Sequence, residues 1–271
     1  MRAFLVPALL LIASIAAAGD GPREVDVELY LAVDVSRSMA PAELEIQRRG
    51  YAAALASDEV IGAIADGLIG EIALTYVEWS GDYAQRVVIP WTLIRDREGA
   101  EAFAARIAAN QRSAMWRTSI SGALRSALAS IETNDIEGLR RVIDISGDGP
   151  NNQGGPVTRA RDAVVASGIT INGLPLMTRD GIGSSWHLED LEDYYRYCVI
   201  GGPGAFMIPV RDWSAFALAV KRKLVLEIAG LSPPPVARVV PAQYFGMTED
   251  GYDCLIGERI WQENRGRFTL P

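Results

Sequence analysis

Three separate loops of this sequence place hydroxyl and carboxylate side chains beside apolar or glycine-flanked segments. The first loop carries Asp34, Ser36 and Ser38 at alternate positions, the second carries Thr118, and the third carries Asp148 between two glycines. Mg²⁺ is a hard cation that prefers about six oxygen ligands at about 2.0–2.1 Å, and side chains with short stems hold that geometry. The residue types predict a divalent-cation site made of oxygens, with Mg²⁺ as the expected ion and Ca²⁺ or Mn²⁺ as alternatives.

The hydroxyls and the carboxylates have different roles in this hypothesis. Ser36, Ser38 and Thr118 would be neutral ligands, whereas Asp34 and Asp148 would bind directly or through water and orient the hydroxyls. Few anionic ligands would leave the metal electrophilic, so that an acidic group of a partner completes its coordination. Each loop also has a simpler interpretation, because Asp, Ser and Thr favour turns and helix caps.

The elements that must position these loops alternate between apolar strands and amphipathic helices. This alternation predicts an α/β fold with a doubly wound, mostly parallel sheet flanked by helices, in which a hairpin makes 85–91 an antiparallel edge strand. In such sheets ligands bind beyond the carboxyl ends of the strands, where all three loops would lie. The predicted strands are Val25–Val35, Glu71–Trp79, Gln85–Trp91, Arg140–Ser146, Ile169–Leu174 and Ala205–Pro209, and the predicted helices are Ala42–Ser57, Glu98–Asn110, Thr118–Ile131, Val157–Ser167, Leu188–Tyr195 and Asp212–Ile228.

The two ends of the chain differ from the middle in composition. Residues 1–18 have one early arginine, an apolar run and a final Ala-Ala-Ala, which is typical of a cleaved secretory signal; an uncleaved membrane anchor is the alternative. No later stretch is long and apolar enough to span a bilayer, so we expect a periplasmic or secreted protein without a stable membrane span. Residues 25–230 form the predicted domain, and the proline-rich residues 231–271 are expected to be an extended tail packed on it.

Cysteine and charge limit the function further. Cys198 and Cys254 are an even pair in an exported chain, which favours a disulfide over two free thiols. With His187 as the single histidine, the sequence does not favour a zinc site. The whole chain has 26 basic and 34 acidic residues, and loss of Arg2 with the signal leaves a net charge of −9. The absence of a basic run argues against a nucleic-acid partner.

The motifs DVSRSM, the isolated Thr118 and ISGDG resemble the von Willebrand factor A (VWA) domain family and its metal-ion-dependent adhesion site (MIDAS). Within that family the chain most resembles a bacterial exported group labelled DUF1194. The resemblance covers about 25–230 and implies a Rossmann-like VWA fold. It implies the metal residues Asp34, Ser36, Ser38, Thr118 and Asp148. Arg37 departs from the family pattern, which usually has glycine there, and would place a positive charge beside the metal. This charge would either favour an anionic partner or weaken cation binding.

These observations favour a non-enzymatic, adhesion-type binding module that captures a carboxylate of a protein partner. A metal-assisted hydrolase and a structural envelope protein with a stabilising metal are the alternatives. The predicted site offers no histidine or cysteine as a catalyst, and we expect His187 to be a surface residue. Trp116 is expected at the rim of the site, the aromatic residues of Tyr194–Cys198 around the disulfide, and Asp144 at a strand end, bonded to backbone.

Overall fold

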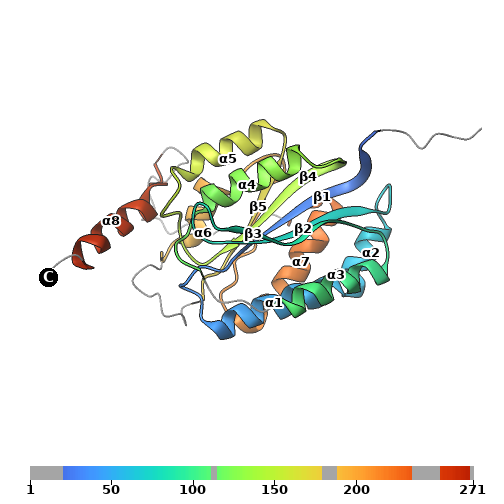
Figure 1. The fold of residues 1–271 in the computed structure, drawn as a ribbon, viewed down its shortest axis with the longest axis horizontal. Coiled ribbons are helices and arrows are strands. Elements are labelled where there is room, and N and C mark those ends of the chain that lie inside the picture. The colour runs from blue at the N-terminus through green and yellow to red at the C-terminus, as the bar shows by residue number, and fades with distance from the viewer. Residues whose placement is uncertain (1–20, 111–114, 179–187, 234–250, 269–271) are drawn as a thin grey trace, which may run out of the picture.

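A five-stranded sheet forms the centre of the computed structural model, which describes residues 21–110, 115–178, 188–233 and 251–268 (Figure 1). The strand order is β3-β2-β1-β4-β5, and every neighbouring pair is parallel except β2 and β3. The predicted mostly parallel sheet with one antiparallel edge strand is therefore confirmed. The strands are β1 (Arg23–Asp34), β2 (Ile72–Trp79), β3 (Gln85–Ile94), β4 (Ile136–Gly147) and β5 (Thr170–Pro175).

Helices cover both faces of the sheet (Figure 1). Helix α1 packs against α3 and α7, and α2 packs against α7, which makes one layer; α4 and α5 pack together on the other face. The bounds are α1 (Pro41–Leu55), α2 (Asp58–Ala65), α3 (Arg97–Ala109), α4 (Ile120–Glu132), α5 (Val157–Ala166) and α7 (Phe216–Ala229).

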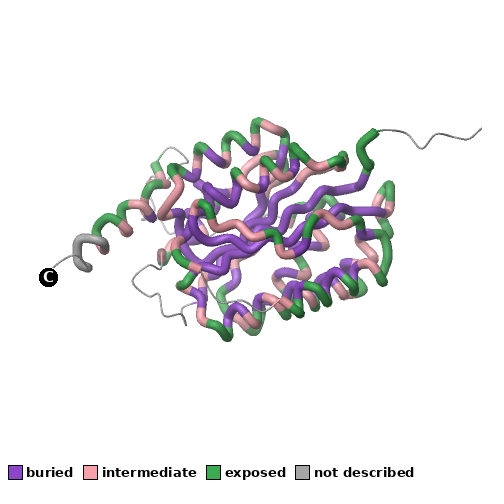
Figure 2. The backbone as a smooth tube through the Cα atoms, viewed as in Figure 1, coloured by how far each residue is buried: buried purple, intermediate pink, exposed green. Residues whose placement is uncertain are grey.

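The central strand β1 supplies side chains to both cores. Leu29, Leu31 and Val33 join the cluster shared with α1, α3 and α7, whereas Tyr30 and Ala32 join the cluster beneath α4 and α5. Alternate side chains of a strand point to opposite faces, so a strand covered on both faces is apolar almost without interruption. Figure 2 shows this strand buried along nearly its whole length.

Four predicted elements differ from the structure. Residues 205–209 make one isolated bridge, Gly173–Met207, instead of a sixth strand, because Pro209 lacks a donor N–H and glycines precede the segment. The first predicted helix ends at Leu55, and Ser57, expected to be its last residue, instead caps a separate α2 by accepting the Val60 N–H. The short helix predicted at Leu188–Tyr195 becomes α6 (Leu191–Tyr194) with a π-turn (Tyr195–Val199). The helix predicted at Asp212–Ile228 forms as α7, preceded by a 3₁₀ turn (Trp213–Ala215).

The sequence predicts an extended tail, but the structure differs. The tail contains the helix α8 (Ile256–Phe268). Proline is concentrated before 242, and the stretch after Cys254 has the glutamate, isoleucine and arginine content that permits a helix. The predicted disulfide between Cys198 and Cys254 is present, with Cα atoms 5.5 Å apart, and it joins α8 to the π-turn. Tyr252 stacks on Tyr197 at 5.7 Å, so aromatic rings surround the disulfide as predicted.

No helix in the described part of the chain is long and apolar enough to cross a bilayer. The predicted signal at 1–18 and His187 lie outside the described residues.

A buried charge cluster joins β4 to α7. Lys223 of α7 is fully buried; its Nζ lies 2.7 Å from Asp144 Oδ1 and also pairs with Glu227, one helical turn further along α7. Asn172 of β5 donates to Glu227 at 2.9 Å. The prediction that Asp144 bonds only to backbone at a strand end is therefore wrong, because its partner lies 79 positions away in the chain.

One cation faces two acids in this cluster, and burial disfavours their charged forms. Burial, followed by the charge of Asp144, raises the pKa of Glu227 to about 7, and burial also raises the pKa of Asp144. Tyr51 packs against the same groups, and its pKa is raised by burial and by Asp144. The cluster therefore retains a proton near neutral pH.

We predict that Glu227→Gln removes part of the pH dependence of stability. A carboxyl whose folded pKa is raised stabilises the fold fully below its unfolded pKa and loses that contribution as pH rises through about 7. The wild-type free energy of unfolding should fall by about 2 kcal/mol relative to the variant between pH 5 and pH 8. Urea unfolding across this range measures it, with the exposed Glu98→Gln as a control, and parallel curves for wild type and Glu227→Gln would contradict the prediction.

Candidate metal centre

Asp34 and Asp148 lie at the carboxyl edge of the sheet, because β1 ends at Asp34 and the parallel β4 ends just before Asp148. Asp34 is fully buried, and its Oδ1 accepts the N–H of Ser36 at 2.7 Å, which turns the chain directly after the strand. Gln47 of α1 donates to the backbone oxygen of Asp34 at 2.9 Å. The first loop is thereby fixed by its own turn and by the neighbouring helix.

Four of the five predicted residues are joined by hydrogen bonds. Ser36 Oγ and Ser38 Oγ are 2.9 Å apart, and Ser38 Oγ donates to Asp148 Oδ1 at 2.8 Å. Together with the bond from Ser36 to Asp34, these contacts connect residues 110 positions apart in the sequence. The first and third loops therefore converge, as the sequence predicted.

Thr118 is held next to the third loop through its backbone. Its N–H donates to Asn152 Oδ1 at 3.1 Å, and its carbonyl accepts the Asn152 N–H at 2.9 Å. Met115 donates to Val35 at 2.8 Å, which pairs the second loop with the first. The Thr118 hydroxyl is not part of the hydrogen-bonded series from Ser36 to Asp148, so its place in the site rests on these backbone contacts.

The two carboxylates disfavour each other in the absence of a cation. Burial, followed by the charge of Asp148, raises the pKa of Asp34 well above its usual range. Asp34 Oδ2 is buried and has no hydrogen-bond partner among the described residues. A buried acceptor without a partner is costly, and a dication would offset both this cost and the repulsion. The buried carboxylates of Asp34 and Asp148 therefore fit the divalent cation that the sequence predicts.

The donor set contains oxygen atoms alone. Within the described residues no cluster of three or more His, Cys, Asp or Glu side chains could hold a metal, and the candidate centre has two carboxylates beside three hydroxyl residues. This set suits Mg²⁺, Mn²⁺ or Ca²⁺ better than ions that prefer sulfur or imidazole.

Asparagines and glutamine that follow Asp148 fasten the loops together, a role the sequence prediction missed. Asn151 accepts the Ser121 N–H at 2.9 Å and donates to Glu258 of α8 at 2.7 Å. Gln153 accepts the Asp82 N–H at 3.2 Å, and its backbone oxygen accepts from Ser119 Oγ at 2.9 Å. The Asn-Asn-Gln run inside a glycine-flanked loop was the available signal, since amide side chains bridge backbone groups.

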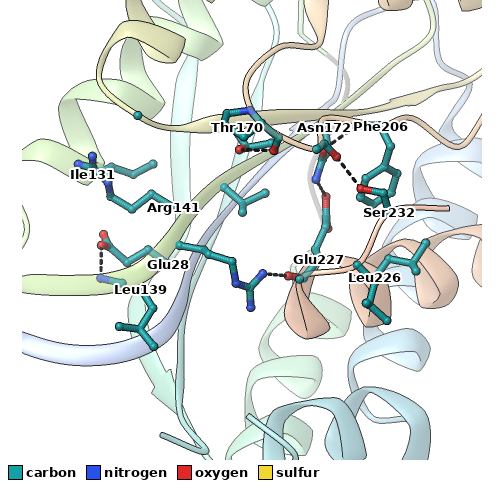
Figure 3. A pocket seen from close by; sticks show the side chains of 18 of the residues that line it. Glu28, Ile131, Leu139, Arg141, Thr170, Asn172, Phe206, Leu226, Glu227 and Ser232 are labelled. Carbon is teal, nitrogen blue, oxygen red and sulfur yellow. Dashed lines mark hydrogen bonds between the residues drawn. The ribbon is translucent and has the colours of Figure 1, made fainter. Parts of the chain in front are cut away.

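A separate pocket of about 600 Å³ lies at the other end of the sheet, where β4 begins and α7 ends (Figure 3). Arg140 crosses it and donates to the carbonyls of Glu227 and Ile228 at 2.5 and 2.6 Å, which caps the carboxyl end of α7. Glu28 in its wall accepts the Gly138 N–H at 2.8 Å. These polar groups serve the fold, and the pocket is remote from the candidate metal centre.

Known structures share this fold. Matches include a zinc-occupied MIDAS structure of proximal thread matrix protein 1 from the mussel byssus (14% identity, TM-score 0.52, 77% of this chain and 49% of that one). A von Willebrand factor type A structure from Catenulispora acidiphila matches at 15% identity with a TM-score of 0.52, over 76% of this chain and 43% of that one. The pilus adhesin SpaC from Lactobacillus rhamnosus GG matches at 9% identity with a TM-score of 0.53, over 78% of this chain and 32% of that one. The chain thus spans about half or less of their lengths.

The architecture is therefore that of a VWA domain. The chain belongs to the family described as a protein of unknown function (DUF1194), whose model matches residues 24–232. A search of curated protein sequences found no significant match. Helix α8 and the second cysteine of the disulfide lie beyond the part that the family model covers.

We predict that Gly147→Ala damages the candidate centre. A Cβ at this position would lie 2.8 Å from Tyr195 Oη, 3.0 Å from Asp34 Oδ2 and 3.3 Å from the Trp79 ring. All three groups are buried, so the variant should lose about 1–3 kcal/mol of unfolding free energy.

The matched control is Gly62→Ala in α2, where an added Cβ meets nothing within 4 Å. This control should be neutral or slightly stabilising, because alanine favours a helix. Urea unfolding of both variants checks the pair, and equal stabilities of Gly147→Ala and wild type would contradict the crowding argument.

Proposed function

We propose that this protein is an exported, non-enzymatic binding module that uses a MIDAS-like divalent cation to capture a carboxylate of a protein partner. The observation that carries the proposal is the pair of buried carboxylates, Asp34 and Asp148. They are connected through the backbone N–H of Ser36 and the hydroxyls of Ser36 and Ser38, and one Asp34 oxygen has no partner among the described residues. The VWA fold and its adhesin and matrix-protein neighbours support a protein-binding role.

Each residue has a defined task in this proposal. Ser36, Ser38 and Thr118 supply neutral oxygens, and Asp34 and Asp148 supply the negative charge and orient the hydroxyls. The bound ion, Mg²⁺ with Ca²⁺ or Mn²⁺ as alternatives, would supply positive charge for an incoming anion. Five side chains, some of them acting through water, would leave at least one coordination position of the ion open, and a partner's carboxylate would fill that position.

A hydrolase is the main competing function. A metal site can activate water, but proton transfer also needs a positioned acid or base. Among the described residues, the buried ionisable groups next to the candidate centre are the two aspartates themselves and Tyr195, whose pKa burial raises well above its usual value. This chemistry favours holding an anion over transferring a proton.

Export through residues 1–18 and a periplasmic or secreted location complete the proposal. The disulfide supports it, because such bonds persist in oxidising compartments. In these compartments a protein partner would be another envelope or extracellular protein.

We predict opposite effects of Asp34→Asn with and without metal. In EDTA the variant should be as stable as wild type or more stable, because it removes the repulsion with Asp148. With Mg²⁺, wild type should gain about 2.7 kcal/mol at a hundredfold excess over its Kd, and the variant should gain little. Thermal unfolding in EDTA, Mg²⁺, Mn²⁺ and Ca²⁺ measures both effects.

The control is Asp66→Asn, which removes an exposed carboxylate far from the site and should respond to metal like wild type. If wild type melts at the same temperature in EDTA and in every metal, the metal-dependent function is wrong. Phosphatase or esterase activity that Asp148→Asn abolishes would favour the hydrolase instead. Metal stabilisation without EDTA-sensitive capture of any envelope protein would favour the structural role.

A further inference from the structure

Arg37 stands between two of the candidate metal residues and stacks on an exposed indole. Its guanidinium carbon lies 3.8 Å from the centroid of the Trp116 ring. Arg37 is exposed, and Trp116 retains 71% of its accessible surface. Within the described residues the Arg37 side chain makes no ion pair, so its charge is directed to solvent beside the site.

The backbone holds this stack in place. Met115 bonds to Val35 at 2.8 Å and bridges to Ser36, so that Trp116 and Arg37 extend from two strand-like segments in register. Stacking uses the face of the guanidinium and leaves its N–H groups, which lie in the plane, able to bind a carboxylate in bidentate fashion. The arrangement therefore presents an oriented anion receptor next to Ser36 and Ser38.

A second stack lies along the same rim. Arg117 lies 3.5 Å from the centroid of the Trp261 ring of α8. Its φ of 76° lies in the left-handed region, and this turn sends consecutive side chains, Trp116 and Arg117, to different stacks. The disulfide and the bond from Asn151 to Glu258 hold α8 there. A chain of net charge −8 thus concentrates cationic groups where the proposed partner would arrive.

An exposed tryptophan adds little to the stability of its own fold, because its surface stays in water. Tryptophan and arginine are the residue types enriched in the energetic centres of protein interfaces. The combination of exposure, fixed geometry and charge at Arg37 and Trp116 indicates a surface built for an acidic partner.

We propose that the Arg37–Trp116 stack is a second anchor, which binds a second carboxylate in an acidic segment of the partner protein, close in sequence to the carboxylate held at the metal. This inference rests on the proposed function. Side chains two positions apart in an extended segment point the same way and are about 7 Å apart. Arg37 is covalently adjacent to Ser36 and Ser38, so a pair of acids spaced in this way reaches both the metal residues and the guanidinium.

The test uses the mature chain with saturating Mn²⁺ and two capped, fluorescent peptides. One carries Asp-Gly-Asp and the other Asp-Gly-Asn between identical Gly-Ser flanks. Wild type should bind the peptide with two acids about 5–10-fold more tightly by fluorescence anisotropy, the size expected for one hydrogen-bonded contact at an exposed site. Arg37→Ala should reduce the ratio to about one, whereas Arg37→Lys and Trp116→Ala should give intermediate ratios, because lysine is a point charge and a free arginine is less ordered.

The matched control is Arg95→Ala. Arg95 also has an exposed side chain, but it follows the antiparallel β3 and lies at the opposite edge of the sheet. The Arg95→Ala variant loses the same charge as Arg37→Ala and should keep the wild-type ratio of the two peptide affinities.

The outcomes separate this inference from the proposed function. If wild type is stabilised by Mn²⁺ but binds both peptides equally, or neither of them, the second anchor is wrong while the metal site stands. Equal losses in Arg37→Ala and Arg95→Ala would show a general charge effect and would also overturn it. If Mn²⁺ does not stabilise wild type, the proposed function itself fails. The thermal shift of Arg37→Ala with Mn²⁺ should be at least as large as that of wild type, because the variant removes a positive charge beside the ion.

Discussion

The structure depends on the close burial of two carboxylates at one edge of the sheet. Burial and the charge of Asp148 make ionisation of Asp34 less favourable, and Ser36 and Ser38 connect the two carboxylates without neutralising them. Such an arrangement is destabilising by itself and persists because the surrounding fold determines it. A divalent cation, bound as proposed above, would relieve this repulsion.

The fold meets this requirement by making β1 and β4 adjacent and parallel. Their carboxyl ends then bring the first and third loops together, and the second loop is bonded by its backbone to both. Because Gly147 has no side chain, Asp34 Oδ2 and Tyr195 Oη can both lie close to its backbone. A Cβ at this position would crowd both atoms. Precise placement of the acids thus comes from strand register and from one missing Cβ.

The sequence predicted the parts of this structure that are encoded locally. Nearly continuous apolar runs located β1, β2 and β4, and the polar residues that follow β1 and β4 indicated the site. The pairing of Asp144 with Lys223 was missed because no local pattern reports a contact between a strand and a helix 79 positions later. The roles of Asn151 and Asn152 were missed for a similar reason, since amide side chains in a loop reveal their acceptors only after folding. Helix α8 was hidden by the proline-rich composition that precedes it.

The disulfide between Cys198 and Cys254 would hold the molecule together covalently after a single cut in the chain between these residues. It closes a loop that spans 56 positions, and α8 lies just beyond it. A protease that cleaves once inside this loop would produce two polypeptides still linked through sulfur. Trp261 would then remain beside Arg117 as part of a separate chain, and only a reductant would release it. The rim could therefore survive nicking in an extracellular setting.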